Sequence, residues 1–398
     1  MMEREVLASR APGKWEQGGI VRNAQSEESR DRVRAYGVAP GIMDVGPANG
    51  LTDVPGVRVG HRTIIEGKDV RTGVTAILPH GGSLFRDRVP AGIAVANGYG
   101  KLMGTTQVAE LGELETPIVL TNTLSVPQAA EGILEWTLAR ERAEDVRSIN
   151  PVVGETNDGR LNAVAKRVIG VGHVLDALSS ASDRCPEEGN VGAGTGTVAF
   201  GWKGGIGTSS RVLPDSMDGY TVGVLVQSNF GGILNVLGVP IGRLLNRFYL
   251  QAETADGTAD GSIMIVVATD APLSDRNLRR LAWRAFAGLA RTGSSFVNGS
   301  GDYSIAFSTA SEVRRTPDRR NALTRYPELP NDAMSPLFQA VIEATEEAIH
   351  NSLFMARSMT GRDEVLVEAL PIERTIHLLH ERGVIARSVR RDVPRTRL

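Results

Sequence analysis

The chain has 398 residues, and 44 Lys and Arg against 46 Asp and Glu give a formal net charge of −2. This balance excludes a strong overall field toward nucleic acid or anionic lipid, and we expect no nucleic-acid partner. A composition of 41% apolar and 23% charged residues excludes disorder as the main state. Cys185 is the only cysteine, so no intrachain disulfide or cysteine zinc cluster can form, and we expect a reducing, cytoplasmic location. No stretch approaches the roughly 18 uninterrupted apolar residues of a membrane span, so we expect no membrane partner.

The two ends of the chain differ from its middle. Residues 1–34 are charged and lack the apolar segment of a signal peptide, which predicts a flexible N-terminal extension. Residues 386–398 carry five arginines, which we interpret as a solvated tail, with an anion site as the alternative. Residues 35–385 show neither a repeat of fixed period nor a linker, so we expect one domain. A domain of this size favours a multilayered sandwich or a homo-oligomer that covers its sheet.

The pattern of apolar residues predicts a mixed order of strands and helices. Short Val, Ile and Ala runs between turn residues are typical of buried strands, and apolar residues at helical spacing indicate helices. In chain order we expect strands at Val74–Leu78, Ala91–Ala96 and Ile118–Thr121, helices at Ser125–Arg140 and Arg167–Ser179, two strand-like pieces punctuated by glycines within Asn190–Arg211, strands at Gly219–Val226 and Ser262–Thr269, a helix at Ser274–Thr292, a strand at Tyr303–Ser308, and a helix at Ser335–Met359. The later three strands are predicted to form the central sheet.

One junction has the features of a self-cleaving serine site. A small polar loop runs through Gly261 and Ser262 directly into the strongest apolar strand. A glycine carbonyl followed by a serine hydroxyl suits an intramolecular acyl shift, because glycine places no Cβ near the carbonyl. Cleavage there would leave Ser262 as a new N-terminus, whose α-amine could act as general base for its own Oγ. The alternative is an ordinary turn before a strand.

Two further segments carry groups that could assist such a serine. Ser300 and Asp302 lie on a predicted tight turn, where an alcohol beside a carboxylate can hold or relay a proton. Asn229 ends a predicted strand, and its amide N–H could stabilise an oxyanion. The alternatives are a hairpin turn with an Asp cap and a turn rich in Asn.

Eight segments in collinear order resemble the L-aminopeptidase/D-esterase (DmpA) family, which includes β-peptidyl aminopeptidases. The resemblance covers roughly residues 34–384. The segments begin at Gly50 (GLTDVPGVRVGH), Arg71 (RTGVTAILP), Thr121 (TNTLSV), Asn150 (NPVVGETNDG), Lys203 (KGGIGTSSR), Gln227 (QSNFGG), Gly261 (GSIMIVVATDAP) and Ser358 (SMTGRD).

This resemblance implies a fold, a processing event and a site. The fold would be α/β, a four-layer α/β/β/α sandwich similar to the N-terminal-nucleophile hydrolases but differently connected. The precursor would break between Gly261 and Ser262 into an α chain ending at residue 261 and a β chain starting at 262. Ser262 would be the nucleophile, Asn229 the oxyanion donor, and Ser300 with Asp302 the supporting pair.

The family also implies substrate contacts between residues 150 and 162. Glu155 is our candidate for pairing with a substrate's α-ammonium, which would explain exopeptidase specificity, and the alternative is a solvated loop residue. The resemblance implies a tyrosine near here that assists the oxyanion site, and this chain has Arg160 in the corresponding Asp-Gly-X-Leu-Asn context. We therefore predict an aminopeptidase for small peptides, amides or esters that needs no metal or organic cofactor.

Other functions have weaker support. The glycine-rich segments that begin at Gly192 and Gly205 lack a Walker lysine and the order of a dinucleotide fingerprint. His377 and His380 have the spacing of metal ligands, but no third ligand is evident. Two alternatives stay open: an acyltransferase of the ornithine-acetyltransferase type, since an amine can intercept the same acyl-enzyme, and an unprocessed, non-catalytic relative.

Overall fold

The computed structural model describes residues 30–251 and 261–386. Expectations for the N-terminal extension, the loop before Gly261 and the arginine-rich tail fall on residues outside these ranges, and they stay predictions. Arg32 and Arg34 lie within the predicted extension, but both contact the domain. Arg32 pairs with Glu188 at 2.7 Å, and Arg34 pairs with Glu347 at 2.8 Å.

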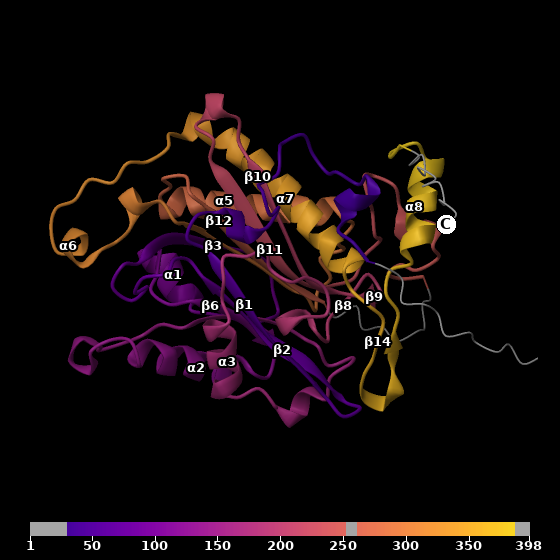
Figure 1. Ribbon diagram of the computed structural model, residues 1–398, viewed down its shortest axis with the longest axis horizontal. Coiled ribbons are helices and arrows are strands. Elements are labelled where there is room, and N and C mark those ends of the chain that lie inside the picture. Colours follow the sequence, from indigo (N-terminus) through magenta and orange to yellow (C-terminus); the bar gives the residue numbers. More distant parts are fainter. Residues whose placement is uncertain (1–29, 252–260, 387–398) are drawn as a thin grey trace, which may run out of the picture. The chain divides into compact units, whose positions relative to one another are not determined.

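Two β-sheets form the centre of the domain (Figure 1). The first sheet has the order β1 (Arg58–Glu66), β2 (Val70–Leu78), β6 (Ile118–Asn122), β7 (Val152–Thr156) and β4 (Leu102–Met103). The second sheet has the order β10 (Gly205–Val212), β11 (Thr221–Asn229), β12 (Ser262–Thr269), β13 (Gly301–Ser308), β3 (Val89–Gly98) and β5 (Glu113–Leu114). The pairs β6–β7 and β12–β13 are parallel, and the other pairs are antiparallel.

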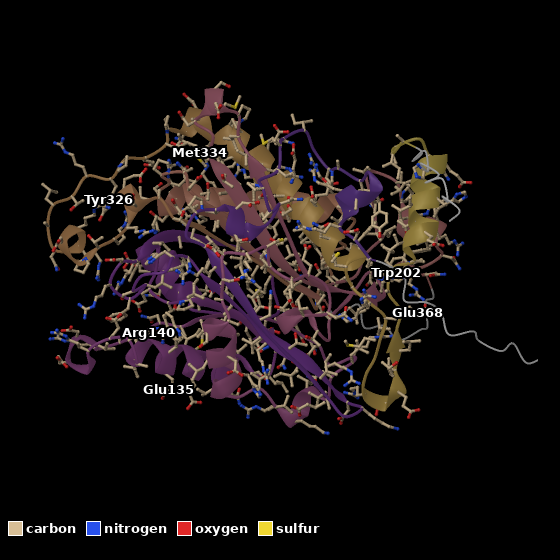
Figure 2. All side chains as sticks on the ribbon, viewed as in Figure 1. Glu135, Arg140, Trp202, Tyr326, Met334 and Glu368 are labelled. Atoms are coloured by element: carbon tan, nitrogen blue, oxygen red, sulfur yellow. The ribbon has the colours of Figure 1, made fainter. Side chains whose placement is uncertain are left out.

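Helices cover the outer face of each sheet. The main helices are α2 (Val126–Leu138) and α3 (Val171–Ser179) on the first sheet, and α5 (Asp275–Arg291) and α7 (Met334–Phe354) on the second. Figure 2 places Arg140, beyond the end of α2, and Met334, at the start of α7, on opposite sides of the two sheets. Shorter elements are α1 (Thr105–Leu111), α4 (Ile241–Leu244), α6 (Pro317–Arg320), α8 (Ile372–Glu381), and the hairpins β8 (Val198–Ala199) with β9 (Trp202–Lys203) and β14 (Met359–Thr360) with β15 (Leu366–Val367). Single 3-10 turns occur at Val33–Tyr36, Leu51–Asp53, Ala143–Asp145, Val164–Lys166, Gly192–Gly194, Asp215–Met217, Ser311–Val313, Asn331–Ala333 and Arg362–Glu364.

Strand β12 shows how the layers pack, because successive side chains of a strand point to opposite faces. Ile263, Ile265 and Val267 belong to the core beneath α5 and α7. Met264 and Val266 belong to the core between the sheets. A third core joins the first sheet to α2 and α3. These three cores make the four-layer α/β/β/α sandwich that the family resemblance implies, and β11, β12 and β13 form the centre of its second sheet.

Most predicted elements are present, with two differences of physical interest. The sequence predicts two strand-like pieces within Asn190–Arg211 but not their bounds, and strand β10, with the polar sequence GIGTSSRV, is nearly all buried. Helix α7 ends at Phe354 rather than at Met359. The side chain of Asn190 accepts a hydrogen bond from Arg357 N and donates one to its carbonyl, which holds this segment outside the helix.

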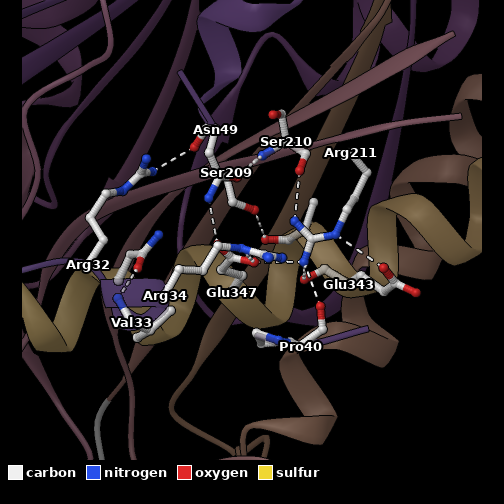
Figure 3. A network of polar contacts seen from close by, with 12 residues as sticks. Arg32, Val33, Arg34, Pro40, Asn49, Ser209, Ser210, Arg211, Glu343 and Glu347 are labelled. Carbon is white, nitrogen blue, oxygen red and sulfur yellow. Dashed lines mark hydrogen bonds and ion pairs between the residues drawn. The ribbon is translucent and has the colours of Figure 1, made fainter. Parts of the chain in front are cut away.

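Polar groups of β10 are buried because α7 provides partners for them. Arg211 is fully buried, and its guanidinium lies between Glu343 and Glu347 of α7 (Figure 3). The distances are 3.1 Å from Nε to Glu343 and 2.8 Å from Nη2 to Glu347. Ser209 also donates to the backbone carbonyl of Ala344 at 2.7 Å. The strand and the helix are therefore joined by charge and hydrogen bonds as well as by apolar contact.

Candidate active site

Ser262 is the first residue of β12, and the register of the sheet brings two other predicted segments to it. Asn229, the last residue of β11, is its partner on one side, and Gly301, the first residue of β13, is its partner on the other. Ser262 is buried, and its Oγ donates to the carbonyl oxygen of Gly261 at 2.6 Å. The N–H of Gly301 donates both to Ser262 Oγ, at 3.3 Å, and to the Gly261 carbonyl, at 3.2 Å. One backbone donor thus contacts both the hydroxyl and the carbonyl that precedes it.

The backbone on both sides of Ser262 is packed too closely for side chains. A Cβ on Gly261 would lie 2.6 Å from Phe230 Cα, and a Cβ on Gly301 would lie 2.7 Å from the backbone of Gly100. Contacts this short require the backbone to shift. Glycine at these positions therefore allows three chain segments to meet around the Ser262 hydroxyl.

Asn229 is oriented by the β8–β9 hairpin. Its Oδ1 accepts a hydrogen bond of 2.9 Å from the backbone N–H of Val198. Because this bond engages the oxygen, the amide NH₂ is the part of the side chain left to donate. Asn229 lies opposite Ser262 in the antiparallel pair, so its NH₂ is available at the same end of the sheet.

Ser300 and Asp302 contact each other, as the sequence suggested. Ser300 Oγ donates to Asp302 Oδ1 at 2.6 Å, whereas the buried Oδ2 has no hydrogen-bond partner among the described residues. Burial raises the pKa of Asp302 to about 6, although the Ser300 hydrogen bond acts in the opposite direction. Within the described ranges, no hydrogen bond joins either side chain to Ser262, so the pair adjoins the nucleophile through Gly301.

Glu155 is a buried carboxylate near the same glycines. It lies near the end of β7, and its Oε1 accepts hydrogen bonds from Lys101 N at 3.0 Å and from Lys101 Nζ at 3.4 Å. Its Oε2 is buried and has no partner among the described residues. A Cβ on Gly100 would lie 3.0 Å from Glu155 Oε1 and 3.3 Å from Gly301 Cα. Glu155 is thus separated from the Ser262 strand pair by little more than the backbone of Gly100.

A pocket of about 500 Å³ is lined in part by Gly100 and Lys101, the two residues next to this carboxylate. Lys101 and Tyr303 contribute to its wall, and Tyr303 lies two residues beyond Gly301. Burial raises the pKa of Tyr303, and the charges of Glu155 and Asp302 raise it further. The lining residues are Gly100, Lys101, Leu102, Met103, Thr105, Val126, Pro127 and Tyr303.

Arg160 lies apart from this cluster. Its side chain is exposed on the loop after β7, and its role in substrate binding stays a prediction. The buried acid of that loop is Asp158, which accepts a hydrogen bond of 2.9 Å from Asn162. Burial raises the pKa of Asp158 to about 6.

Sequence reasoning assigned no role to Lys203, although this residue supports the Asn229 loop. Its side chain is fully buried, and Nζ donates to the carbonyls of Gly194, at 3.0 Å, and Gly204, at 2.8 Å. Lys203 is also the register partner of Val198, whose N–H orients Asn229. Burial lowers the pKa of Lys203 to about 7. Its position in a glycine-rich motif was the available signal.

Lys101 was also missed, and no local pattern marks it. It follows β3 and reaches Glu155 only in the folded chain.

The histidines offer no metal site. Within residues 30–251 and 261–386, no group of three or more His, Cys, Asp and Glu side chains is arranged to hold a metal ion. His377 instead pairs with Glu381 on α8, at 3.2 Å. Among the helices of these same ranges, none combines the length and the apolar character needed to cross a membrane.

A serine at the end of a buried strand, with amide donors and carboxylates around it, is an arrangement typical of hydrolases with a serine nucleophile. Comparisons with known proteins narrow this class. The model of peptidase family S58 matches residues 49–367. The β-peptidyl aminopeptidase BapA of Sphingosinicella microcystinivorans is 40% identical over 378 residues, which cover 89% of this chain and 93% of that protein.

Solved structures agree with the family match. A β-aminopeptidase from a Burkholderia species superposes with a TM-score of 0.82 at 39% identity, covering 89% of this chain and 99% of the other. The L-aminopeptidase D-Ala-esterase/amidase of Ochrobactrum anthropi gives a TM-score of 0.81 at 37% identity with the same coverage. That enzyme is described as a prototype of the serine aminopeptidases and as a variant of the Ntn hydrolase fold. The present chain therefore belongs to peptidase family S58 and is a serine-type aminopeptidase.

Proposed function

We propose that this aminopeptidase cleaves its own chain between Gly261 and Ser262 and then uses Ser262 to remove N-terminal residues from small peptides, amides or esters. The observation that carries this proposal is the contact of Ser262 Oγ with the Gly261 carbonyl, with the Gly301 N–H donating to both groups. A nucleophile, its target carbonyl and a donor for the developing charge are thus present in one place.

Self-cleavage follows from this contact by an acyl shift. Ser262 Oγ attacks the Gly261 carbonyl carbon, and the negative charge on the carbonyl oxygen is stabilised by the Gly301 N–H. The tetrahedral intermediate collapses as the C–N bond breaks, and the hydroxyl proton passes to the leaving nitrogen. This step frees the α-amine of Ser262, and water then hydrolyses the ester, which releases the Gly261 carboxylate and the Ser262 hydroxyl.

The processed site would act on a substrate by the same chemistry. The α-amine of Ser262, with an ordinary pKa of roughly 7.7–8.0, takes the Oγ proton while Oγ attacks the substrate carbonyl. The Asn229 amide is held with its NH₂ free to stabilise the oxyanion. The amine protonates the leaving group, and water hydrolyses the acyl-enzyme.

Glu155 supports the restriction to N-terminal residues. It is a buried carboxylate with one oxygen that has no partner among the described residues. The backbone of Gly100 and Gly301 separates it from Ser262. A substrate α-ammonium would satisfy that oxygen, and an internal peptide bond brings no such charge. The aminopeptidase relatives do not favour the acyltransferase alternative or the non-catalytic one.

Two broader expectations belong to the same proposal. A cytoplasmic location is supported by the single cysteine. A homo-oligomer of processed units is supported by the size of the domain.

Peptides with a free or a blocked N-terminus test the substrate assignment. We expect the purified protein to release the N-terminal residue of a tripeptide, and to process its N-acetylated form roughly 10- to 100-fold more slowly, because the acetyl group removes the charge that pairs with Glu155. Mass spectrometry of the products over time gives both rates. Equal rates for the two peptides, or cleavage at internal bonds, would contradict the proposal.

The pKa of Asp302 predicts the shape of the pH profile. Its carboxyl loses its proton above about pH 6, and in the ionised form it accepts the Ser300 hydrogen bond. An ordinary α-amine alone lowers log kcat/KM with a slope of one on the acid side. We expect the slope to steepen below about pH 6, where Asp302 also becomes protonated.

Two variants show which carboxyl takes up the proton that steepens the slope below about pH 6. Asp302→Asn should remove the steeper part, whereas Asp158→Asn should keep it, although burial raises the pKa of Asp158 to a similar value. A slope of one in the unaltered enzyme down to pH 5 would show that Asp302 has no part in the reaction.

A further inference from the structure

Lys101 both contacts Glu155 and lines the pocket. Its ammonium lies 3.4 Å from Glu155 Oε1 and 2.7 Å from Thr123 Oγ1, and the residue contributes to the pocket wall. The side chain of Lys101 is 52% exposed, whereas that of Glu155 is 2% exposed. A cation of the protein thus already contacts the carboxylate that the proposed function assigns to the substrate.

This ion pair is suited to exchange. Its distance is long and its cation is half exposed, so solvent screens it and its contribution is small. The backbone N–H of Lys101 holds Glu155 Oε1 at 3.0 Å independently of the side chain. The ammonium can therefore leave while the carboxylate keeps its place.

The exchange has a consequence for the substrate. When a substrate ammonium binds Glu155, two positive charges, that of the substrate and that of Lys101, lie next to one carboxylate. Their repulsion is unfavourable unless the Lys101 ammonium pairs with another anion. Two extended residues span at most about 7 Å, so the C-terminal carboxylate of a dipeptide lies near the ammonium of the same molecule. A bound dipeptide thus replaces the Lys101–Glu155 ion pair by two ion pairs, one between its ammonium and Glu155 and one between its carboxylate and Lys101. A bound dipeptide amide forms only the pair with Glu155 and leaves Lys101 without an anionic partner.

We propose that Lys101 is a specificity-determining residue that selects short peptides with a free C-terminal carboxylate over the corresponding amides. The inference rests on the proposed binding of the substrate ammonium by Glu155. The substrate class is zwitterionic: one ammonium for Glu155 and one carboxylate for Lys101.

A dipeptide and its C-terminal amide test this inference directly. We expect the unaltered enzyme to show a kcat/KM roughly five- to tenfold higher for the dipeptide, mainly through KM. Lys101→Met should bring the ratio close to one, and Lys101→Arg should retain the preference. Lys68→Met is the matched control, because Lys68 is 85% exposed and pairs with Glu364 on the surface.

The outcomes separate this inference from the function on which it rests. If neither substrate is cleaved, or if Glu155→Gln leaves both rates unchanged, the proposed function fails. If both substrates are cleaved and Glu155→Gln slows both, but the ratio is one in the unaltered enzyme or is unchanged in Lys101→Met, the role of Lys101 is wrong. Circular dichroism of Lys101→Met checks that the half-exposed position tolerates the change.

Discussion

Ser262→Ala is expected to remain a single chain of 42.5 kDa and to lose aminopeptidase activity, whereas the unaltered protein separates into fragments of about 28 and about 15 kDa. The substitution removes the hydroxyl oxygen that lies 2.6 Å from the Gly261 carbonyl oxygen. Without it neither the ester intermediate nor the acyl-enzyme can form. Intact mass under denaturing conditions, with a peptide assay on the same samples, measures both effects.

A matched serine controls for unspecific damage. Ser308, the last residue of β13, is also buried, and its Oγ donates to the Ala271 carbonyl at 2.6 Å. Ser308→Ala should still separate into the same two fragments. A single 42.5 kDa species of the unaltered protein, or cleavage at residue 261 in Ser262→Ala, would refute the proposed mechanism.

The part of the site that sequence predicts lies where strands begin or end. The apolar run after Ser262 has the bounds of β12 as expected, because it is buried on both faces and carries no polar residue before Thr269. Its polar first residue then marks the edge of the sheet, and Asn229 marks the same edge on β11. Local patterns therefore placed both residues at strand ends.

Residues that act through distant contacts escaped prediction. Lys101, between β3 and β4, contacts Glu155 of β7, which lies 54 residues away in the chain, and the local sequence around either residue does not indicate the other. The bounds of strand β10 were not predicted for a similar reason: partners for its buried polar groups come from α7 and from Asn49, far away in sequence. Hydrophobic periodicity cannot report a strand whose burial depends on polar partners.

Arg211→Met is expected to cost about 3–5 kcal/mol of the free energy of unfolding, because it leaves two buried carboxylates without their shared cation. Glu343 and Glu347 have fully buried side chains, and Arg211 contacts both. Burial acts to raise the pKa of Glu347, but the hydrogen bond from Arg34 and the charge of Arg211 outweigh it and lower the pKa. Glu347 keeps Arg34 in the variant, so Glu343 bears most of the loss.

The measurement needs a chain that stays intact. Urea unfolding in the Ser262→Ala background compares single chains and avoids loss of stability through processing. Arg291→Met, which removes an exposed partner of Glu346, should cost no more than about 1 kcal/mol. Adding Glu343→Met to Arg211→Met should recover part of the loss, since it removes a buried charge that has lost its partner.

The pH dependence of the free energy of unfolding shows whether Arg211 stabilises the fold through its charge. A carboxylate with a lowered pKa in the folded state stabilises the protein above its unfolded pKa, near 4.3 for Glu, and this contribution is lost as the pH falls through the folded value. Arg211 lowers the pKa of these carboxyls and so provides this contribution, whereas Met at position 211 does not. The difference in free energy of unfolding between the unaltered protein and Arg211→Met should therefore narrow in acid. A difference that stays constant as the pH falls from 7 to well below about 4.3 would mean that Arg211 stabilises the fold by packing and not by charge.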